Sequence, residues 1–506
     1  MSQLKFGWAE VDITPKEKIA LRGEFFERVT NEVETPITVT ALAIDNGEDH
    51  AVFCSCDLVG IGSSLMLLTR EKLNAPGLNP DKILLNAIHT HNSYTLGDLK
   101  KKNRTDENVT GFARVLKQFL PEGCRYVPEA SDPDQMDPYK ALDFVSDKTA
   151  EAISLAWANR KPGGYVPGFG RAAVGMNRRA CYLDGSAKMW GDVDKAYFTT
   201  LEGGNDNGIE ILLIYDADKK LTGVVANIAC PSQVMEQRSV ISSDYWGKVK
   251  ILLREKYGKD VFLLALCSPA GDQCPRDLIR WVQPETPIKD PNVIRPEPKY
   301  RRADPSMFDV KGTWTIGRRI VSELSYVIDE ADPADIRTDG VLIHQTKTLP
   351  LPLRRVTANE KIAAEKGIRE FFAGKSEVNY IDTAEVHVLS GILDRYEKQK
   401  NVEMFEIEAH NIRLDDIAFA SCPFELFLDF ANEIRARSVA AQNFLIQLSC
   451  GEGGYLPTAK AEAGGHYSAY VASGSVGHEG GDIYVRDVLH EQRKLFGCAV
   501  EGGDDE

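Results

Sequence analysis

The sequence predicts an α/β protein built from mixed, multi-stranded sheets with flanking helices. Two observations lead to this prediction. Several continuous apolar runs have the length of a buried strand, and they alternate along the chain with segments of helical periodicity. Such runs are typical of strands covered on both faces, and ligand sites in these sheets gather beyond the carboxyl ends of the strands. We therefore expect one site at a shared sheet edge.

The expected strands and helices alternate along the chain. Residues 51–55 (AVFCS) are predicted to form a strand, and the amphipathic segment 65–73 a helix. The next apolar run ends in two histidines, and four later runs end in a cysteine followed by proline, serine or glycine. These runs are 82–88, 221–229, 260–266, 415–421 and 444–449, with a helix expected at 426–437 and a solvated helical pair at 359–400.

The two histidines at the end of the 82–88 run are the most informative feature. In an extended strand, residues i and i+2 share a face, so His89 and His91 would point the same way, roughly 6–7 Å apart. One imidazole can then bind a metal while the other meets a substrate. The alternative is a capped strand end with two hydrogen-bonded histidines.

The residues directly after the later runs have several possible roles. Glu425 comes after Pro423 where a helix is predicted to begin, so its carboxylate either benefits from the helix dipole or binds a metal. Cys230 is a candidate zinc ligand or a packing residue, and Cys274 is a nucleophile or an inert small side chain. Tyr455 comes after two glycines and is either a ligand or a packed aromatic ring.

Other polar residues are candidates for catalysis and substrate binding. Asp244 and Asp272 lie beside apolar runs and either orient ligands or act as acid and base. One segment is rich in hydrogen-bond donors, which either bind a substrate carbonyl or carboxylate or form surface salt bridges. A second segment is rich in glycine and aromatic residues, and it forms either a loop over a polar substrate or a tight structural turn. The residues concerned are Asn177, Arg178 and Arg179 in the first segment and His466 in the second.

Composition limits the function classes. The formal net charge of −15 and a pI near 5.3 argue against binding to nucleic acids or anionic membranes, which favour clustered Lys and Arg. No run approaches 18 apolar residues, and the amino terminus has no room for a signal peptide, so we expect a cytoplasmic protein without membrane insertion. The ten cysteines are expected to be reduced thiols.

Several of these motifs occur in an order that resembles a known family. They are GWAEVDITP at 7–15, His89-Thr90-His91, Asn177-Arg178-Arg179, SDYWG at 243–247, GDQCP at 271–275, Pro423-Phe424-Glu425 and Gly454-Tyr455. Together they resemble the catalytic domain of the neutral/alkaline non-lysosomal ceramidases over nearly the whole chain. The resemblance implies a zinc-dependent hydrolase in which two histidines, a glutamate and a tyrosine hold the metal, and the matching residues are His89, Glu425 and Tyr455.

The chain also departs from the family pattern. Cys230 stands where the second zinc histidine is expected, and Cys274 stands where ceramidases have a serine. We expect a single hydrolase domain over residues 1–506, with no C-terminal immunoglobulin-like domain and with loop insertions near 97–139 and 275–302 that either cover the substrate or are disordered. The ceramide substrate is therefore not inherited from the resemblance.

The leading hypothesis is a metal-dependent hydrolase of C–N bonds, an amidase or deacylase, acting on a small, soluble, polar substrate, for example a sugar-derived one. Zinc would be held by His89, Cys230, Glu425 and Tyr455, and the catalytic residues would be His91, Asp244, Asp272 and Cys274. One alternative is a metal-independent hydrolase, such as a glycosidase that uses paired carboxylates, for example Asp244 and Glu425. Another is a catalytically silent binding protein. The partner is a small molecule in each case, and an oligomer is possible.

Overall fold

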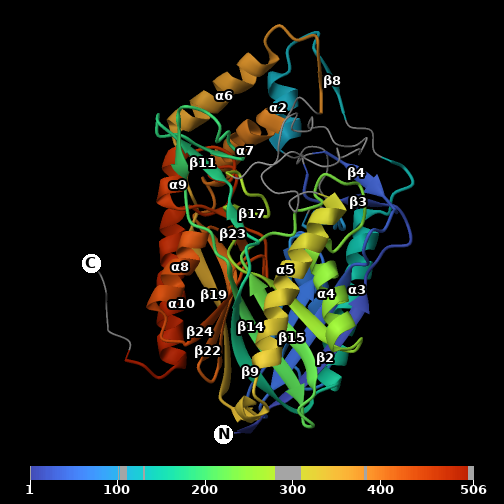
Figure 1. Ribbon diagram of the computed structural model, residues 1–506. Helices are drawn as coiled ribbons and strands as arrows, with labels where there is room; N and C mark the ends of the chain where they lie inside the picture. Colours follow the sequence, from blue (N-terminus) through green and yellow to red (C-terminus); the bar gives the residue numbers. More distant parts are fainter. Residues whose placement is uncertain are drawn as a thin grey trace.

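Two β-sheets packed face to face form the centre of the molecule (Figure 1). The computed structural model describes residues 2–24, 26–100, 102, 111–128, 132–279, 309–380 and 384–499. In spatial order, the eight-stranded sheet contains β16 (Phe262–Cys267), β15 (Leu221–Ile228), β14 (Gly208–Asp216), β9 (Lys161–Arg171), β2 (Lys5–Asp12), β5 (Thr38–Asp45), β6 (His50–Cys56) and β7 (Ile83–Ala87). The four-stranded sheet contains β19 (Leu342–Pro352), β21 (Met404–Leu414), β22 (Ile417–Ser421) and β24 (Gln442–Ile446).

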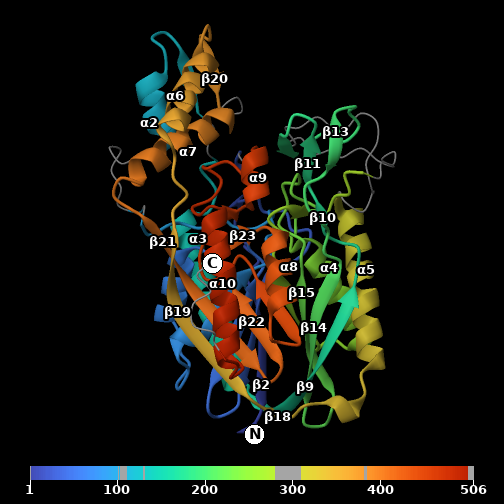
Figure 2. The same ribbon diagram turned by 90° about the vertical axis from the view of Figure 1, so that its left-hand side faces the viewer.

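Helices cover the outer face of each sheet, so that the layers run helix, sheet, sheet, helix across Figure 1. The larger sheet is covered by α3 (Pro138–Ala158), α4 (Asp244–Tyr257) and α5 (Asp309–Glu330), with α1 (Ser63–Glu71) against α3. The smaller sheet is covered by α8 (Leu428–Arg437) and α10 (His478–Leu495), as the turned view in Figure 2 shows. The α/β class with mixed sheets and flanking helices is thus confirmed.

Short paired strands join the loops around this core. The pairs are β1 (Ser2–Gln3) with β18 (Asp339–Gly340), β3 (Ile19–Leu21) with β4 (Arg28–Thr30), and β10 (Met176–Asn177) with β17 (Gln273–Cys274). A further small sheet contains β12 (Ala187–Met189), β11 (Arg179–Tyr182) and β13 (Phe198–Leu201).

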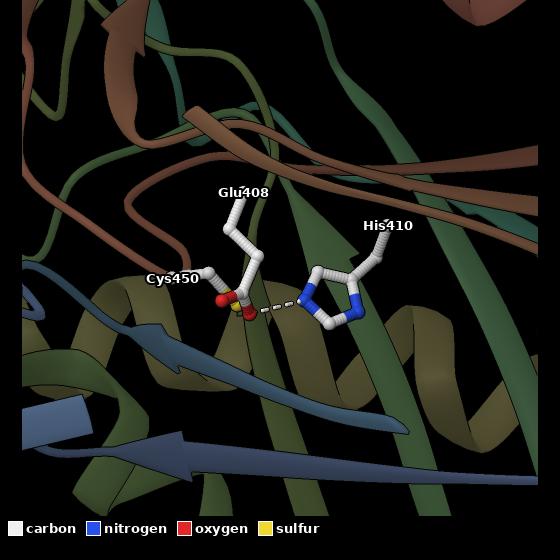
Figure 3. Close-up of side chains that lie close together, drawn as sticks. All are labelled: Glu408, His410 and Cys450. Atoms are coloured by element: carbon white, nitrogen blue, oxygen red, sulfur yellow. Dashed lines mark hydrogen bonds and ion pairs between the residues drawn. The ribbon is translucent and has the colours of Figure 1, made fainter. Parts of the chain in front are cut away.

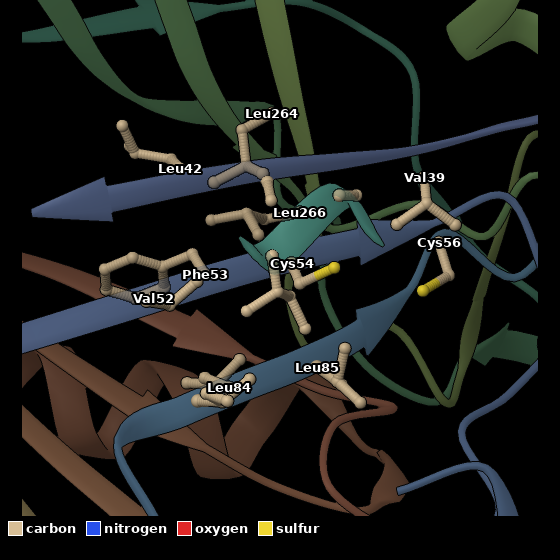
Figure 4. Close-up of a cluster of buried hydrophobic side chains, with 14 of the residues drawn as sticks. Val39, Leu42, Val52, Phe53, Cys54, Cys56, Leu84, Leu85, Leu264 and Leu266 are labelled. Carbon is tan, nitrogen blue, oxygen red and sulfur yellow. The ribbon is translucent and has the colours of Figure 1, made fainter. Parts of the chain in front are cut away.

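The core between the sheets explains why the strand sequences are continuously apolar. Every residue of β7 is buried, and its apolar side chains belong to a core that also includes residues of β16 and of the smaller sheet. Phe53 of the larger sheet contacts Phe419 of the smaller one at a ring-centroid distance of 4.9 Å, and Phe419 stacks on Phe444 at 4.7 Å. Figure 4 shows the neighbouring leucine, valine and cysteine side chains of β5, β6, β7 and β16.

The parallel strand pairs bring several carboxyl ends to one edge. β6 pairs in parallel with β7, β15 with β16, and β22 with β24. Backbone hydrogen bonds continue beyond the strands: the Gln447 N–H donates to the Cys267 carbonyl (2.9 Å), and the Ser268 N–H donates to the Ile228 carbonyl (3.0 Å). The segments after β7, β15, β16, β22 and β24 therefore meet in one region, as the sequence predicts.

A small helical unit lies at the top of Figure 1. It contains α2 (Gly111–Phe119), α6 (Ala358–Phe372), α7 (Ala384–Lys398) and the parallel pair of β8 (Arg125–Val127) with β20 (Glu377–Asn379). The predicted helical pair is present, but it is not simply a solvated surface element, because it encloses a core of its own with α2 that includes Phe119, Ile368 and Phe372. The expected 97–139 insertion contributes α2 and β8, and most of the 275–302 insertion lies outside the described residues.

None of the described helices combines the length and apolar character needed to cross a membrane.

We expect Phe53→Ala to lower the free energy of unfolding by about 3–5 kcal/mol, because it removes a buried ring between the two sheets. Urea unfolding followed by circular dichroism measures the loss. Phe169→Ala is the matched control, since 49% of that side chain is exposed, and it should change stability far less. Equal losses in both variants would contradict this account of the core.

Candidate active site at the carboxyl ends of the strands

His89 and His91 lie in a tight turn and not in an extended strand. β7 ends at Ala87, and His89 has a φ of 68°, in the left-handed region. The expected extended backbone is therefore wrong at His89, although both side chains face the same cavity. The two rings lie 5.0 Å apart between centroids, with 3.5 Å between their Nε2 atoms.

Glu425 and Tyr455 lie side by side on two short parallel strands. β23 (Phe424–Leu426) pairs with β25 (Gly454–Leu456), and the register places Glu425 directly opposite Tyr455. The alternative of Glu425 as a helix N-terminal residue is wrong, because α8 begins only at Leu428. Two backbone approaches around this pair require glycine: a Cβ at Gly271 would lie 2.3 Å from the Glu425 carbonyl, and one at Gly474 would lie 1.8 Å from that of Tyr455.

These four residues line one cavity of about 330 Å³. Arg22 and Glu452 face each other on its wall in a two-armed ion pair, with distances of 2.7 and 3.0 Å. The remaining lining residues are Gly23, Glu24, Val59, Gly60, Pro423, Leu448, Gly454 and Tyr467.

The hydrogen bonds of His89 define its tautomer. Its Nδ1 lies 2.7 Å from the Val59 carbonyl, which can only accept, so Nδ1 carries the proton. In the neutral ring, Nε2 then presents a lone pair, and this atom lies 3.5 Å from Glu425 Oε2. Burial alone would raise the pKa of the Glu425 carboxyl, but a positively charged His89 and Arg178 beside it bring the pKa below its ordinary value. With His89 neutral, two electron-pair donors would face each other, so the contact requires either a second proton on His89 or a cation.

Arg178 organises the other side of the cavity. Its guanidinium is buried and donates to Gln233 Oε1 (3.2 Å) and to the Tyr455 hydroxyl (3.3 Å), with Glu425 Oε2 at 3.8 Å. Because Arg178 can only donate, Gln233 Oε1 must face it, and the Gln233 amide nitrogen then donates to His91 Nε2 at 2.9 Å. His91 consequently carries its proton on Nδ1, which lies 3.5 Å from Glu236 Oε2.

Two pKa values are set by this arrangement. Burial, reinforced by the neighbouring His89 and by Arg28 and Arg178, places the pKa of His91 well below its ordinary value, so the imidazole is neutral. Burial, together with the Glu425 carboxylate, raises the pKa of Tyr455 well above its ordinary value, so the phenol keeps its proton.

Cys230 does not reach this group. Its sulfur lies 3.7 Å from the Val174 carbonyl and 3.5 Å from the Pro231 carbonyl, and its side chain belongs to a buried apolar cluster under β15. Burial raises the pKa of this thiol well above its ordinary value. Across the described part of the chain, no group of ligand atoms joins Cys230 to His89 or Glu425. The geometry therefore does not support the expected cysteine ligand, because the sulfur packs inside the sheet.

The three other expected catalytic residues are held in backbone contacts. Asp244 accepts from the Met235 N–H (2.9 Å) and the Tyr245 N–H (2.7 Å), and burial raises its pKa to about 7. Asp272 accepts from Asn177 Nδ2 (2.8 Å) and from the N–H of Leu428 (3.0 Å), and burial raises its pKa to about 6. The Cys274 thiol lies 3.2 Å from the Arg276 carbonyl, and burial raises its pKa to about 12, which disfavours the nucleophilic thiolate.

Among the expected substrate-binding residues, Arg178 alone reaches the cavity group. Arg179 is fully buried, with Nε 2.6 Å and Nη2 3.1 Å from the two oxygens of Glu202. The Asn177 side chain supports Asp272, and His466 Nδ1 accepts from the Met189 N–H at 3.2 Å. These contacts give Asn177, Arg179 and His466 roles in fixing the loops around the site.

Several residues of the site were not singled out from the sequence. Gln233 and Glu236 come shortly after Cys230 and approach His91, and Arg22 and Glu452 come from segments without a motif. Ligand atoms of Glu24, His91 and Glu236 also lie within 4.8 Å of one another. Gln233 and Glu236 could have been identified from the sequence, because they lie in a polar segment directly after the 221–229 strand. Arg22 and Glu452 are brought to the cavity by the tertiary structure alone.

The fold is similar to two solved structures. The crystal structure of neutral ceramidase from Pseudomonas aeruginosa matches with a TM-score of 0.66 and 16% identity, covering 99% of this chain and 76% of that chain. A ceramidase complexed with C2 matches with a TM-score of 0.63 and 14% identity, covering 99% and 77%. No protein-family model and no curated protein matches the sequence. The ceramidase-like fold indicated by the motifs is therefore confirmed.

We expect Glu202→Gln to destabilise the protein by about 3–5 kcal/mol, because it leaves the buried Arg179 guanidinium without its counter-charge. Chemical denaturation measures the change. Glu433→Gln is the control, since its ion pair with Arg437 is exposed and should contribute about 0–1 kcal/mol. A loss in Glu202→Gln as small as that of the control would show that Arg179 does not depend on this pair.

Proposed function

We propose that this protein is a metal-dependent hydrolase that cleaves an amide C–N bond in a small, polar, water-soluble substrate. The observation that carries the proposal is the contact between His89 Nε2 and Glu425 Oε2, in which two electron-pair donors face each other on a cavity wall. The ceramidase-like fold supports a hydrolase, and the cavity supports a small substrate.

The residues present fit a zinc ion. Two ligands of a tetrahedral zinc with bonds of about 2.0–2.1 Å lie about 3.3–3.4 Å apart, close to the 3.5 Å between His89 Nε2 and Glu425 Oε2. The Val59 carbonyl fixes the His89 tautomer in the way expected for a metal ligand. His89, Glu425 and Tyr455 would hold the ion. When bound, zinc supplies a Lewis acid that polarises a carbonyl and makes a water molecule more acidic.

Neighbouring side chains orient the residues that would hold the metal. Arg178 neutralises part of the Glu425 charge and holds the Tyr455 hydroxyl through a donated hydrogen bond. It also orients Gln233, which fixes His91 as a neutral ring with its Nε2 turned toward His89. His91 is therefore placed to position a substrate group beside the metal ligands.

The cavity wall favours a polar substrate. Arg22, Glu24 and Glu452 offer charged groups to a ligand, and the volume of about 330 Å³ suits a small molecule, including one derived from a sugar. The glycosidase alternative receives less support, because both Asp244 oxygens accept backbone N–H groups and Asp244 is not among the residues that line the cavity with Glu425.

Elemental analysis of the purified protein tests the metal. We expect about one zinc per chain, and a decrease of at least about tenfold in His89→Ala and in Glu425→Gln, because each removes a direct ligand. Cys230→Ser is the control and should keep its zinc, since that sulfur lies inside the apolar cluster. A wild-type protein without any metal would mean that the contact holds a proton, and a loss of zinc in Cys230→Ser alone would restore the cysteine as a ligand.

A substrate survey tests the reaction. We expect hydrolysis of short, water-soluble N-acyl compounds, with little turnover of long-chain ceramide or aryl glycosides under the same conditions. Glu425→Gln should lower kcat/KM by at least about a hundredfold. Faster turnover of ceramide than of the soluble amides would refute the small-substrate assignment, and turnover of glycosides alone would refute C–N bond cleavage.

A further inference from the structure

The buried cluster of Glu408, His410 and Cys450 lies outside the proposed active site, and its polar groups bond to the protein itself (Figure 3). His410 bonds to Glu408 through Nε2 and to His344 through Nδ1, both at 2.8 Å. The Cys450 thiol donates to the Leu85 carbonyl, 3.8 Å away. Glu408 and Cys450 also line a cavity of about 630 Å³. These bonds make the cluster a structural network of the core.

A different cavity, of about 420 Å³, opens at the opposite end of the larger sheet. It lies where the first residues of β2, β9, β15 and β16 meet the last residues of β14 and α4. β15 and β16 run in parallel, and their carboxyl ends lie at the candidate active site, so this cavity is separate from that site. β16 is the outermost strand on one side, yet it contacts β2, β5, β6 and β7, so the sheet curls on itself. The open end of such a sheet is a common place for a ligand.

Five aromatic side chains line this cavity. Trp8 and Phe262 stack with their ring centroids 5.5 Å apart and an angle of 1° between their planes. Gly223 permits this packing, because a Cβ at that position would lie 2.5 Å from a carbon of the Trp8 ring. The other three aromatic residues are Phe6, Tyr215 and Tyr257. Rings from three strands of the sheet and one helix, β2, β14, β16 and α4, therefore surround one space.

An aromatic lining of this kind favours a cation without N–H groups. The faces of aromatic rings carry negative charge density, and Trp attracts cations most strongly. Lys256 makes such a contact at this end of the sheet, with its ammonium 4.9 Å from the centroid of the Tyr257 ring. A fully methylated ammonium needs no hydrogen-bond acceptor, so a cavity lined by aromatic rings can replace its water shell.

The rim of the cavity carries charges of both signs. Two lysines and two aspartates line it, and three of these four side chains are exposed. Within the described part of the chain, no ion pair joins Lys161, Lys220 or Asp260 to another side chain, and Asp216 accepts from backbone N–H groups of its own turn. A ligand with a net positive charge meets the lysines, and one with a net negative charge meets the carboxylates. A zwitterion matches both.

We propose that this cavity binds a small zwitterion in which a trimethylated ammonium is joined to a carboxylate, as in trimethylglycine. The aromatic rings surround the methylated ammonium, and Lys161 and Lys220 bind the carboxylate at the rim. The volume of about 420 Å³ lies in the range of small-molecule sites. Binding is non-covalent, and the site is independent of the proposed hydrolase function.

Isothermal titration calorimetry of the whole protein with three matched ligands tests the proposal. Trimethylglycine should bind, and tert-butylacetate, which has carbon in place of the charged nitrogen, should bind at least about fivefold more weakly. Choline keeps the cation and lacks the carboxylate, and it should also bind at least about fivefold more weakly. Equal binding of tert-butylacetate, or no binding of trimethylglycine at about 10 mM, would overturn the proposal. Tighter binding of phenylalanine would also overturn it, because the cavity would then hold an aromatic side chain.

Two variants locate the binding. Tyr215→Leu keeps an apolar side chain but removes a ring, and it should weaken trimethylglycine binding by at least about fivefold. Tyr197→Leu is the matched control: that side chain is 51% exposed, does not line the cavity, and should leave the affinity unchanged. Lys161→Gln should weaken the binding of trimethylglycine but not that of choline, which has no carboxylate. Unchanged affinities in Tyr215→Leu and Lys161→Gln would refute the site. Should Tyr215→Leu not fold, Lys161→Gln and the three ligands on the wild type decide.

Discussion

The pairing of two three-residue strands, Phe424–Leu426 and Gly454–Leu456, determines the geometry of the candidate active site. It places Glu425 and Tyr455 next to each other although 30 residues separate them in the sequence. Parallel strands need a crossover connection, which here is formed by α8 and β24. The positions of Glu425 and Tyr455 therefore depend on how α8 packs on the smaller sheet and how β24 pairs within it. The site thus depends on the core beneath it.

The sequence predicts the part of the site that depends on strand ends. The apolar runs identify β7, β15, β16, β22 and β24, and their common edge explains why His89, Glu425 and Tyr455 could be proposed together. The backbone conformation just beyond each strand is less predictable. The left-handed φ of His89 and the short strand at Glu425 are set by contacts with distant segments, and no local pattern encodes them.

Cys230 shows the limit of motif alignment. Its place in the sequence corresponds to a metal ligand of the resembling family, yet its side chain turns into the apolar cluster, and Gln233 occupies the neighbourhood of His91 instead. Side-chain direction after a strand end depends on each backbone torsion, so a shift of a few residues changes which group faces the cavity. The hydrogen bonds that a side chain makes therefore indicate its role in the site better than its position in a motif does.

The Arg22–Glu452 pair bears on the size of the molecules that the protein can hold. Both residues line the cavity next to His89 and also the one next to Cys450, with Pro423 as a third shared residue. The side chains are 42% and 35% exposed, and an ion pair of this kind is worth about 0–1 kcal/mol, comparable to thermal energy. Rotation of these two side chains changes the wall that the two cavities share. The size of a ligand in either cavity is then limited in part by the rotamer equilibrium of these two residues.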